Sequence, residues 1–223
     1  MINHLSMQLP AYTQIAFINS SYEQKLRQLI PENQVPHVNI SACQKRKDEF
    51  YTGRWCAAIC IHKKTNRFDV PQINQDRSPK WPTNLIGSIS HSNKIAIAAT
   101  EYSHNALAIG IDIQAPIAEQ ELLAIQDLIL SPIELKRFPD LIHHQLFDLF
   151  FSAKETLFKA LYPSCLEFFE HKDAEIISTN KTNSTLDIKL LRSLKTIWKK
   201  DQIFTINYGM MSNEVVTWLL IEK

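Results

Sequence analysis

Residues 108–114 are AIGIDIQ, an apolar run that carries one aspartate at its centre. A short run rich in isoleucine predicts a β-strand, and successive side chains of a strand point to opposite faces. The isoleucines therefore share one face of the strand, and Asp112 and Gln114 share the other. Aspartate is depleted in strands and is rarely buried without a partner. We therefore expect Asp112 to meet a cation or hydrogen-bond donors.

The side chains of Asp112 and Gln114 could hold a metal ion together. Residues two apart in a strand lie roughly 6.6 Å apart, so both oxygens can approach one hard cation, directly or through water. The alternative is an aspartate at a strand end that caps a neighbouring turn. The residues alone leave both interpretations open.

A helix is predicted at 146–161, LFDLFFSAKETLFKAL. Apolar residues recur along one stripe at helical spacing, while Asp148, Ser152, Glu155 and Lys159 fall on a polar face. Lys154 lies among phenylalanines instead, so its stem must follow aromatic rings and its charge must reach a partner. Glu155 and Lys159 could equally form a surface ion pair of about 0.3–0.5 kcal/mol.

The flanking sequence alternates helical and strand patterns. Helices are predicted at 22–30 and 41–64, and the second helix buries Cys56 and Cys60 as small side chains. Residues 70–84 predict a loop, and strands at 94–100 and 107–113 predict an antiparallel hairpin. Ser131, Pro132 and Glu134 predict a helix start with a capping box. The helix that contains 146–161 is expected to begin near 144 and to end at Tyr162-Pro163. Residues 203–208 are expected to pair with 215–221 in a closing hairpin. The fold class predicted is α+β, with two halves of similar size.

Two further segments carry groups that suit phosphate. The stretch 79–92, PKWPTNLIGSISHS, brings Ser90 and His91 together with small residues, and hydroxyls, amides and imidazoles can all donate to phosphate oxygens. Arg46 and Arg54 are a little over two helical turns apart, so both can project from one side of a helix. Such guanidiniums suit the phosphates of a nucleotide, and they equally suit solvent. A lone histidine is more often structural, but the small hydroxylated residues around His91 leave both interpretations open.

Composition excludes several classes of protein. The chain has 223 residues, is 45% hydrophobic and 21% charged, and has a formal net charge of +1, which is typical of a soluble globular protein. Balanced charge argues against nucleic acid as a partner. No apolar window reaches the ~20 residues of a membrane span, and residues 1–12 lack the features of a secretory signal. The four cysteines show no metal-site spacing, so a reduced, cytoplasmic location is expected.

Taken in order, these segments resemble one family. They are RKDEFYTGR (46–54), WP (81–82), GSISH (87–91), GIDI (110–113) and FSAKETLFKA (151–160). Together they resemble the 4′-phosphopantetheinyl transferase superfamily, in the long single-chain type associated with siderophore and other nonribosomal peptide synthetases. The resemblance implies two pseudo-symmetric α/β halves, 1–113 and 114–223, with the active site between them. It also implies transfer of the 4′-phosphopantetheine group of coenzyme A to a serine of an apo acyl or peptidyl carrier protein, with release of 3′,5′-ADP.

The resemblance assigns roles residue by residue. Asp112 and Glu155 would bind Mg²⁺, or Mn²⁺ in its place, and Glu155 or a water it holds would be the base for the attacking serine. Lys159 would meet the phosphates of coenzyme A, and Lys154, which belongs to the same motif, is also expected to bind coenzyme A. The nucleotide end would be held by residues of the first half, namely Ser90, His91, Arg46, Arg54 and Arg77.

One position departs from the family pattern. Many relatives have a second carboxylate where this chain has Gln114, whose amide oxygen can still bind magnesium or orient its water but carries no charge. Magnesium accepts one or two protein carboxylates together with water and substrate phosphates. Gln114 is therefore included among the expected metal ligands, and a monomer is expected from the resemblance.

Two alternatives from other classes remain open at this point. One is a protein that binds coenzyme A or a carrier without turnover, which Gln114 favours and the retained Asp112, Glu155 and Lys159 oppose. The other is a magnesium-dependent nucleotide phosphohydrolase. That enzyme would need a group to position water, and the sequence identifies none.

Overall fold

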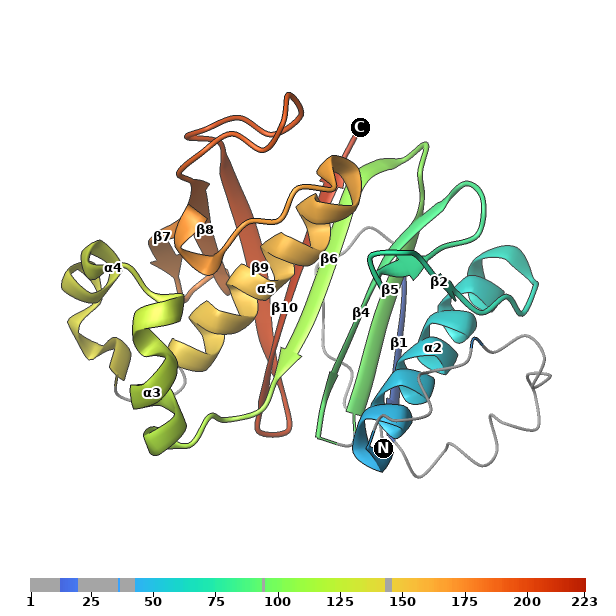
Figure 1. The fold of residues 1–223 in the computed structure, drawn as a ribbon, viewed down its shortest axis with the longest axis horizontal. Helices are drawn as coiled ribbons and strands as arrows, with labels where there is room; N and C mark the ends of the chain where they lie inside the picture. Colours follow the sequence, from blue (N-terminus) through green and yellow to red (C-terminus); the bar gives the residue numbers. More distant parts are fainter. Residues whose placement is uncertain (1–12, 20–35, 37–42, 94, 143–145) are drawn as a thin grey trace. The chain divides into compact units, whose positions relative to one another are not determined.

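The computed structural model describes residues 13–19, 36, 43–93, 95–142 and 146–223, and the chain divides into two compact units (Figure 1). The division falls in strand β6 (Ala106–Gln114), between Ile111 and Asp112, and in strand β10 (Glu214–Glu222), after Leu219. Among the described residues, unit 1 comprises Asp112–Leu219, and unit 2 comprises those up to Ile111 together with Leu220–Lys223. Helices and antiparallel sheets in one chain confirm the α+β class. The halves 1–113 and 114–223, as separate domains, stay a prediction.

Unit 2 is built from one long helix on a three-stranded antiparallel sheet. Helix α2 (Gln44–Thr65) packs on strands β1 (Gln14–Asn19), β5 (Ile95–Tyr102) and β4 (Leu85–Ser92), in the order β1-β5-β4. Small side chains make the close approach possible, because Cys56 and Cys60 are fully buried against a sheet rich in alanine. The Cys56 Sγ donates to the carbonyl of Ala16 at 2.9 Å. The prediction of small, buried cysteines in this helix is confirmed.

Strand pairing in unit 2 corrects two expectations. The predicted hairpin of 94–100 with 107–113 is wrong: β5 lies between β1 and β4, whereas β6 lies beside β10 in another sheet. A strand has only two edges, and both edges of β5 are occupied. The predicted loop at 70–84 contains a small hairpin, β2 (Gln72–Ile73) with β3 (Pro79–Lys80). The helix predicted at 22–30 lies outside the described residues.

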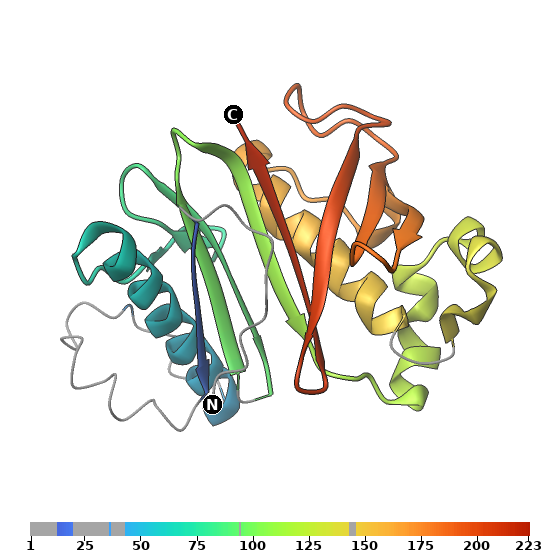
Figure 2. The same ribbon diagram turned by 180° about the vertical axis from the view of Figure 1, so that it is seen from behind.

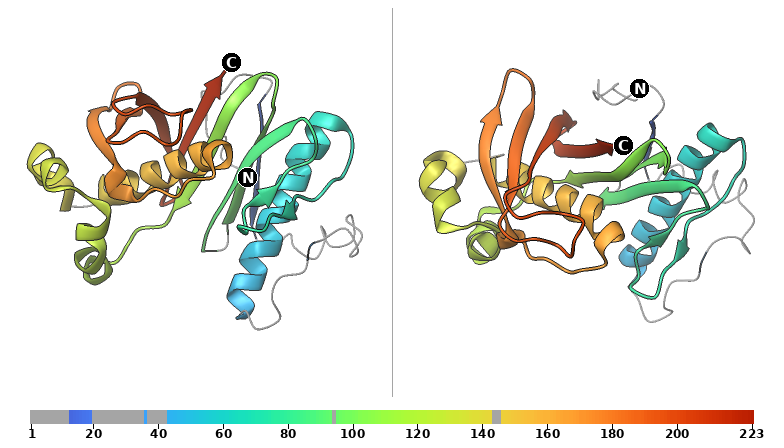
Figure 3. Two further views of the ribbon diagram at one scale, coloured as in Figure 1. Left: turned by 45° about the horizontal axis from the view of Figure 1, so that its top comes forward. Right: turned by 90° about the horizontal axis from the view of Figure 1, so that it is seen from above.

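Unit 1 is built around helix α5 (Leu146–Cys165), which covers one face of the larger sheet (Figure 3). That sheet has the strand order β6-β10-β9-β8-β7, with β9 (Ile203–Met211), β8 (Thr185–Leu190) and β7 (Ala174–Asn180). Figure 2 shows the opposite face of the β9–β10 hairpin, with α5 behind it. The predicted apolar stripe of α5 and the closing hairpin are both confirmed. Helix α5 continues through Pro163, because a proline in the last turn removes only one intrahelical hydrogen bond.

The described part of unit 1 also contains four short helical segments. They are α3 (Glu119–Ile129), α4 (Pro132–Arg137), the 3₁₀ turn η3 (Pro139–Ile142) and the 3₁₀ turn η4 (His171–Asp173). The capping box at the start of α4 is confirmed: the Glu134 amide donates to Ser131 Oγ at 3.2 Å, and the Ser131 amide donates to Glu134 Oε2 at 2.8 Å. Glu134 Oε1 also accepts from the amide of Ile176, which links α4 to β7. None of the helices seen in the structure is long and apolar enough to cross a membrane.

Gly87 in strand β4 is required by close packing. A Cβ atom at this position would lie 2.4 Å from the Trp81 ring and 2.6 Å from the carbonyl oxygen of Ala99. A Cβ atom at Gly53 in α2 would lie 2.9 Å from one methyl group of Ile89. The obstacle at Gly87 includes backbone, which cannot move away, whereas the obstacle at Gly53 is the end of a side chain.

We expect Gly87→Ala to destabilise the protein by about 1–3 kcal/mol, the usual cost of overpacking. Gly53→Ala is the matched control, because alanine favours a helix by roughly 0.5–1 kcal/mol over glycine and so offsets the shift of Ile89. Thermal unfolding followed by circular dichroism measures both variants. Equal midpoints for the two variants would contradict this account of Gly87.

Candidate active site

The Asp112 carboxylate of β6 is buried, with the residue only 4% exposed, and it is satisfied by two side chains of α5. The Lys159 Nζ donates to Asp112 Oδ1 at 2.6 Å, and the Ser152 Oγ donates to Asp112 Oδ2 at 2.7 Å. The polar face predicted for α5 thus meets the polar face predicted for the strand. The site holds a carboxylate and an ammonium group in direct contact.

Buried hydroxyl groups hold Ser152 in place. Its Oγ lies 2.9 Å from Thr217 Oγ1 on β10, and Thr217 Oγ1 in turn donates to the Ser152 carbonyl at 3.0 Å. Thr156 Oγ1 lies 2.6 Å from the same Thr217 hydroxyl. Thr217 lies 65 residues beyond Ser152 and was not identified by the sequence analysis. These contacts hold Ser152 against β10, where its hydroxyl donates to the Asp112 carboxylate.

Glu155 lies one turn before Lys159 on α5 and bonds to a residue that the sequence analysis missed. Its Oε1 lies 2.7 Å from His171 Nε2 of η4, and each of the two side chains is 29% exposed. Lys159 bonds to Asp112 and Glu155 bonds to His171. Each of the two side chains therefore has a partner outside α5, in addition to any ion pair between Glu155 and Lys159. Glu155 thus stands at the surface with one oxygen already bonded.

Lys154 is buried, and all three of its ammonium protons are engaged within unit 1. Nζ donates to the carbonyl of Ile129 at 2.8 Å, to Glu134 Oε2 at 2.9 Å and to the carbonyl of His171 at 3.0 Å. Burial lowers the pKa of Lys154, and the neighbouring Glu134 carboxylate opposes that shift. The expected partner for this charge is therefore Glu134, and the contact of Lys154 with coenzyme A stays a prediction.

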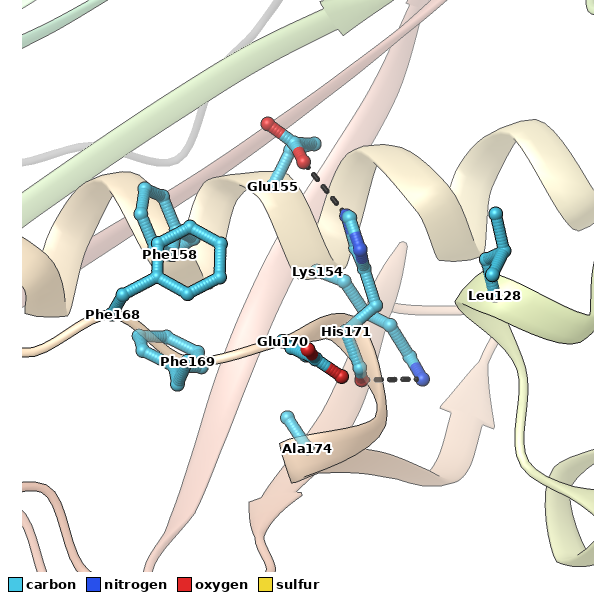
Figure 4. Close-up of a pocket in the computed structure, with 9 residues that line it drawn as sticks. All are labelled: Leu128, Lys154, Glu155, Phe158, Phe168, Phe169, Glu170, His171 and Ala174. Atoms are coloured by element: carbon cyan, nitrogen blue, oxygen red, sulfur yellow. Dashed lines mark hydrogen bonds and ion pairs between the residues drawn. The ribbon is translucent and has the colours of Figure 1, made fainter. Parts of the chain in front are cut away.

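A cavity of about 310 Å³ opens beside Glu155 and His171 (Figure 4). Its apolar wall is aromatic, with the Phe158 ring 5.4 Å from that of Phe168 and 5.2 Å from that of Phe169. The polar end carries the Glu155 carboxylate and the His171 ring. The cavity is therefore lined by an apolar aromatic wall and by the hydrogen-bonded pair of Glu155 and His171.

The donor set of unit 1 suits magnesium by its chemistry. Gln114 lies on the same strand face as Asp112, and its Nε2 donates to the carbonyl of Ala115 at 2.7 Å. Within the described ranges, no three His, Cys, Asp or Glu side chains gather as a ready metal site. Magnesium needs only one or two carboxylates when phosphates and water complete its shell. The buried Asp112 carboxylate, neutralised here by an ammonium group, fits such a cation.

Arg54 of unit 2 is a buried cation with few partners. The residue is 5% exposed, its Nη2 donates to the carbonyl of Gln72 at 3.5 Å, and its guanidinium carbon lies 4.7 Å from the centre of the Phe50 ring. Its Nε is buried and bonds to none of the described atoms. Burial lowers the pKa of Arg54 to about 10. An unsatisfied donor on a buried cation favours an anionic ligand at this position.

The other predicted residues of unit 2 lie on several elements and differ in exposure. Arg46 is exposed at the start of α2, while Arg54 is buried, so the two differ in environment. Arg77 is exposed in the β2–β3 turn with φ of 69°. Ser90 is buried and His91 is 42% exposed at its side chain, 3.9 Å from Glu49 Oε2. His91 also lines a cavity of about 460 Å³ together with α2 residues.

Comparisons with known proteins point to one family. Residues 35–101 match the model of the 4′-phosphopantetheinyl transferase N-terminal domain, and residues 108–208 match the model of the 4′-phosphopantetheinyl transferase superfamily. The chain is 31% identical to enterobactin synthase component D of Escherichia coli (strain K12) over 178 residues, which is 79% of this chain and 78% of the relative. It is 26% identical to 4′-phosphopantetheinyl transferase Npt of Nocardia iowensis over 164 residues, 70% of this chain and 72% of the relative. It is 31% identical to 4′-phosphopantetheinyl transferase Svp of Streptomyces mobaraensis over 163 residues, 69% and 62% of the two chains.

Lys154→Met leaves the Glu134 carboxylate buried beside no ammonium group. We expect a loss of about 3–5 kcal/mol in the free energy of unfolding, the usual cost of breaking a buried ion pair. The double variant Lys154→Met/Glu134→Gln removes both charges and should recover part of that loss. Urea denaturation of the parent and the variants measures the difference. A double variant no more stable than Lys154→Met would contradict this interpretation of the pair.

Proposed function

The chain belongs to the 4′-phosphopantetheinyl transferase superfamily, and from this membership we propose how its side chains carry out the transfer. The enzyme moves the 4′-phosphopantetheine group of coenzyme A to a carrier protein. The observation that carries the assignment of roles is the buried Asp112 carboxylate, bonded to Lys159 and Ser152, within the stretch that matches the family. A binding protein without turnover and a nucleotide phosphohydrolase find no support among the relatives.

Asp112 and Glu155 are proposed to hold Mg²⁺, or Mn²⁺ in its place, with Gln114 contributing its amide oxygen or orienting a bound water. Two carboxylates of unit 1 and the substrate phosphates form the donor set that magnesium prefers. When bound, the ion neutralises charge on the pyrophosphate as its bond to the leaving group breaks. The Ser152 hydroxyl donates to Asp112, and the backbone of Ser152 is held by the Thr217 hydroxyl of β10.

Glu155 is proposed to accept the proton of the attacking serine, directly or through a water. The serine oxygen forms a bond to the phosphorus that carries the pantetheine arm, the bond from that phosphorus to the bridging oxygen breaks, and 3′,5′-ADP leaves. A carboxylate at the surface can take such a proton, and Glu155 is 29% exposed beside a cavity. Lys159 stabilises the negative charge that develops on the phosphate oxygens.

The nucleotide end of coenzyme A is proposed to bind residues of unit 2. Arg54 offers a buried guanidinium with an unsatisfied Nε, and a phosphate oxygen would satisfy it. Ser90 and His91 are proposed to supply a hydroxyl and an imidazole to the 3′-phosphate. Arg46 and Arg77, both exposed, are proposed to add their charges at the nucleotide end. Lys154 is proposed to support the site by holding the segments around it, since its protons are bonded to the Ile129 carbonyl, Glu134 and the His171 carbonyl.

The partner is proposed to be an acidic, helical acyl or peptidyl carrier protein or a carrier domain of a synthetase. Several relatives are named enterobactin synthase component D. This name supports a role in siderophore or other nonribosomal peptide synthesis. We propose that the enzyme works as a monomer in the cytoplasm. Nucleic acid has no part in this scheme.

Mass spectrometry of an apo-carrier protein tests the transfer. The protein is mixed with coenzyme A, Mg²⁺ and the carrier, and the carrier should gain the mass of one phosphopantetheine group. Coenzyme A bound without that gain would indicate a binding protein, and coenzyme A cleaved without labelling would indicate a hydrolase; either result would overturn the proposal.

Asp112→Ala and Glu155→Ala should each lower the transfer rate by roughly 10²-fold or more, the range for a lost acid–base or electrostatic group. The matched control is Glu121→Ala, which removes an exposed carboxylate from α3 and should leave the rate unchanged. Circular dichroism establishes that each variant is folded. Transfer at the parent rate by a folded Asp112→Ala or Glu155→Ala variant would refute the role given to that residue.

Gln114→Glu should tighten magnesium binding, because it adds a negative charge to the face of β6 that carries Asp112. Isothermal titration of Mg²⁺ into the protein measures the effect in the absence of carrier. Gln120→Glu adds the same charge on the exposed side of α3 and serves as the control. If the two variants give the same titration as the parent, Gln114 does not touch the ion.

A further inference from the structure

His171 begins the 3₁₀ turn η4 and lies against the carboxylate of Glu155. The distance between His171 Nε2 and Glu155 Oε1 is 2.7 Å, and the two residues are 16 positions apart in the chain. An ionised carboxylate can only accept hydrogen bonds, so Nε2 must carry the proton and donate it. Figure 4 shows the His171 ring below Glu155, with the second carboxylate oxygen pointing away from the ring.

The position of His171 is fixed from two further directions. Its backbone carbonyl accepts a hydrogen bond from Lys154 Nζ at 3.0 Å, which the close-up also shows. Its ring lies 5.5 Å from the ring of Phe151, at an interplanar angle of 31°. Two consecutive residues of α5 therefore hold His171. Lys154 bonds to its backbone carbonyl, and Glu155 bonds to its ring.

The turn around His171 is itself braced. Glu170 and Asp173 form a reciprocal capping box, with the Glu170 amide donating to Asp173 Oδ2 at 2.9 Å. The guanidinium of Arg192 bonds to the same carboxylate, with Nε 3.0 Å from Asp173 Oδ2. A donor placed on a braced turn can restrict a flexible partner, because the turn does not move when the bond forms.

We propose that His171 is a positioning residue for Glu155: its Nε2–H holds Oε1 and thereby directs Oε2 toward the reacting groups. This inference rests on the proposed role of Glu155 in the transfer. A free glutamate side chain samples many rotamers, and fixing it in advance removes that cost from the reaction. The alternative is an ordinary exposed ion pair, worth only about 0–1 kcal/mol and without effect on the rate.

Three variants separate these interpretations. His171→Ala removes the donor and should lower kcat roughly 10-fold to 10²-fold, the usual effect of a misplaced catalytic group, with little change in KM for coenzyme A. His171→Gln places an amide N–H near the position of Nε2 and should recover most of the lost kcat. Lys172→Ala removes the exposed side chain next in the same turn and should match the parent.

The transfer assay distinguishes failure of this inference from failure of the proposed function. A parent enzyme that does not label its carrier overturns both. A parent that labels, with His171→Ala equal to it, overturns the positioning role alone, and so does a His171→Gln variant as slow as His171→Ala.

A measurement without activity supports or refutes the contact itself. In ¹⁵N-histidine NMR spectra of the full chain, the Nε2 signal of His171, assigned from its absence in His171→Gln, should shift when Glu155 is replaced by Ala. The other histidine signals serve as internal controls. An unchanged His171 signal in Glu155→Ala would show that the bond does not form in solution and would overturn the proposal.

Discussion

The buried carboxylate of Asp112 is the constraint around which unit 1 is arranged. An aspartate in an apolar strand loses its hydration, and several kcal/mol must be recovered by partners inside the protein. Lys159 supplies a charge and Ser152 supplies a hydroxyl. Both side chains reach Asp112 only if α5 has one particular position along the strand and one particular rotation about its own axis. Thr217 then ties Ser152 to β10. The hydrogen bonds that satisfy this one carboxylate therefore fix the position of a helix relative to two strands.

A second buried charge organises the opposite side of α5. Glu134 belongs to the capping box of α4, and its oxygens also accept hydrogen bonds from Lys154 and from the Ile176 amide. The Lys154 ammonium adds the carbonyls of Ile129 and His171. Consecutive residues on a helix point about 100° apart, so Lys154 can face this buried cluster while Glu155 faces the cavity. Lys154 thus supports the structure, while Glu155 is the residue for which a role in the reaction is proposed.

Local patterns predicted the elements that local forces determine. The apolar stripe of α5, its polar face, the capping box of Ser131 and the small buried side chains of α2 all follow from spacing within a few residues. The pairing of β5 was predicted wrongly, because strand edges are filled by distant segments and β1 and β4 compete for them. His171 and Thr217 were missed for the same reason. Each lies in a segment with no chemical pattern of its own, and only the fold brings it to α5.

The contact between Lys159 and Asp112 also bears on how an anionic substrate would enter. An ammonium group has three protons, and Lys159 directs one of them to a carboxylate while part of its side chain stays exposed. A phosphate that approaches from the exposed side meets a cation whose position is already fixed, so little reorganisation is needed. A cation that joins Asp112 would take over the neutralisation that Lys159 provides, leaving the ammonium to the phosphate. The ion pair that stabilises the buried Asp112 carboxylate would then be separated on binding, with Asp112 facing the metal ion and Lys159 facing the phosphate.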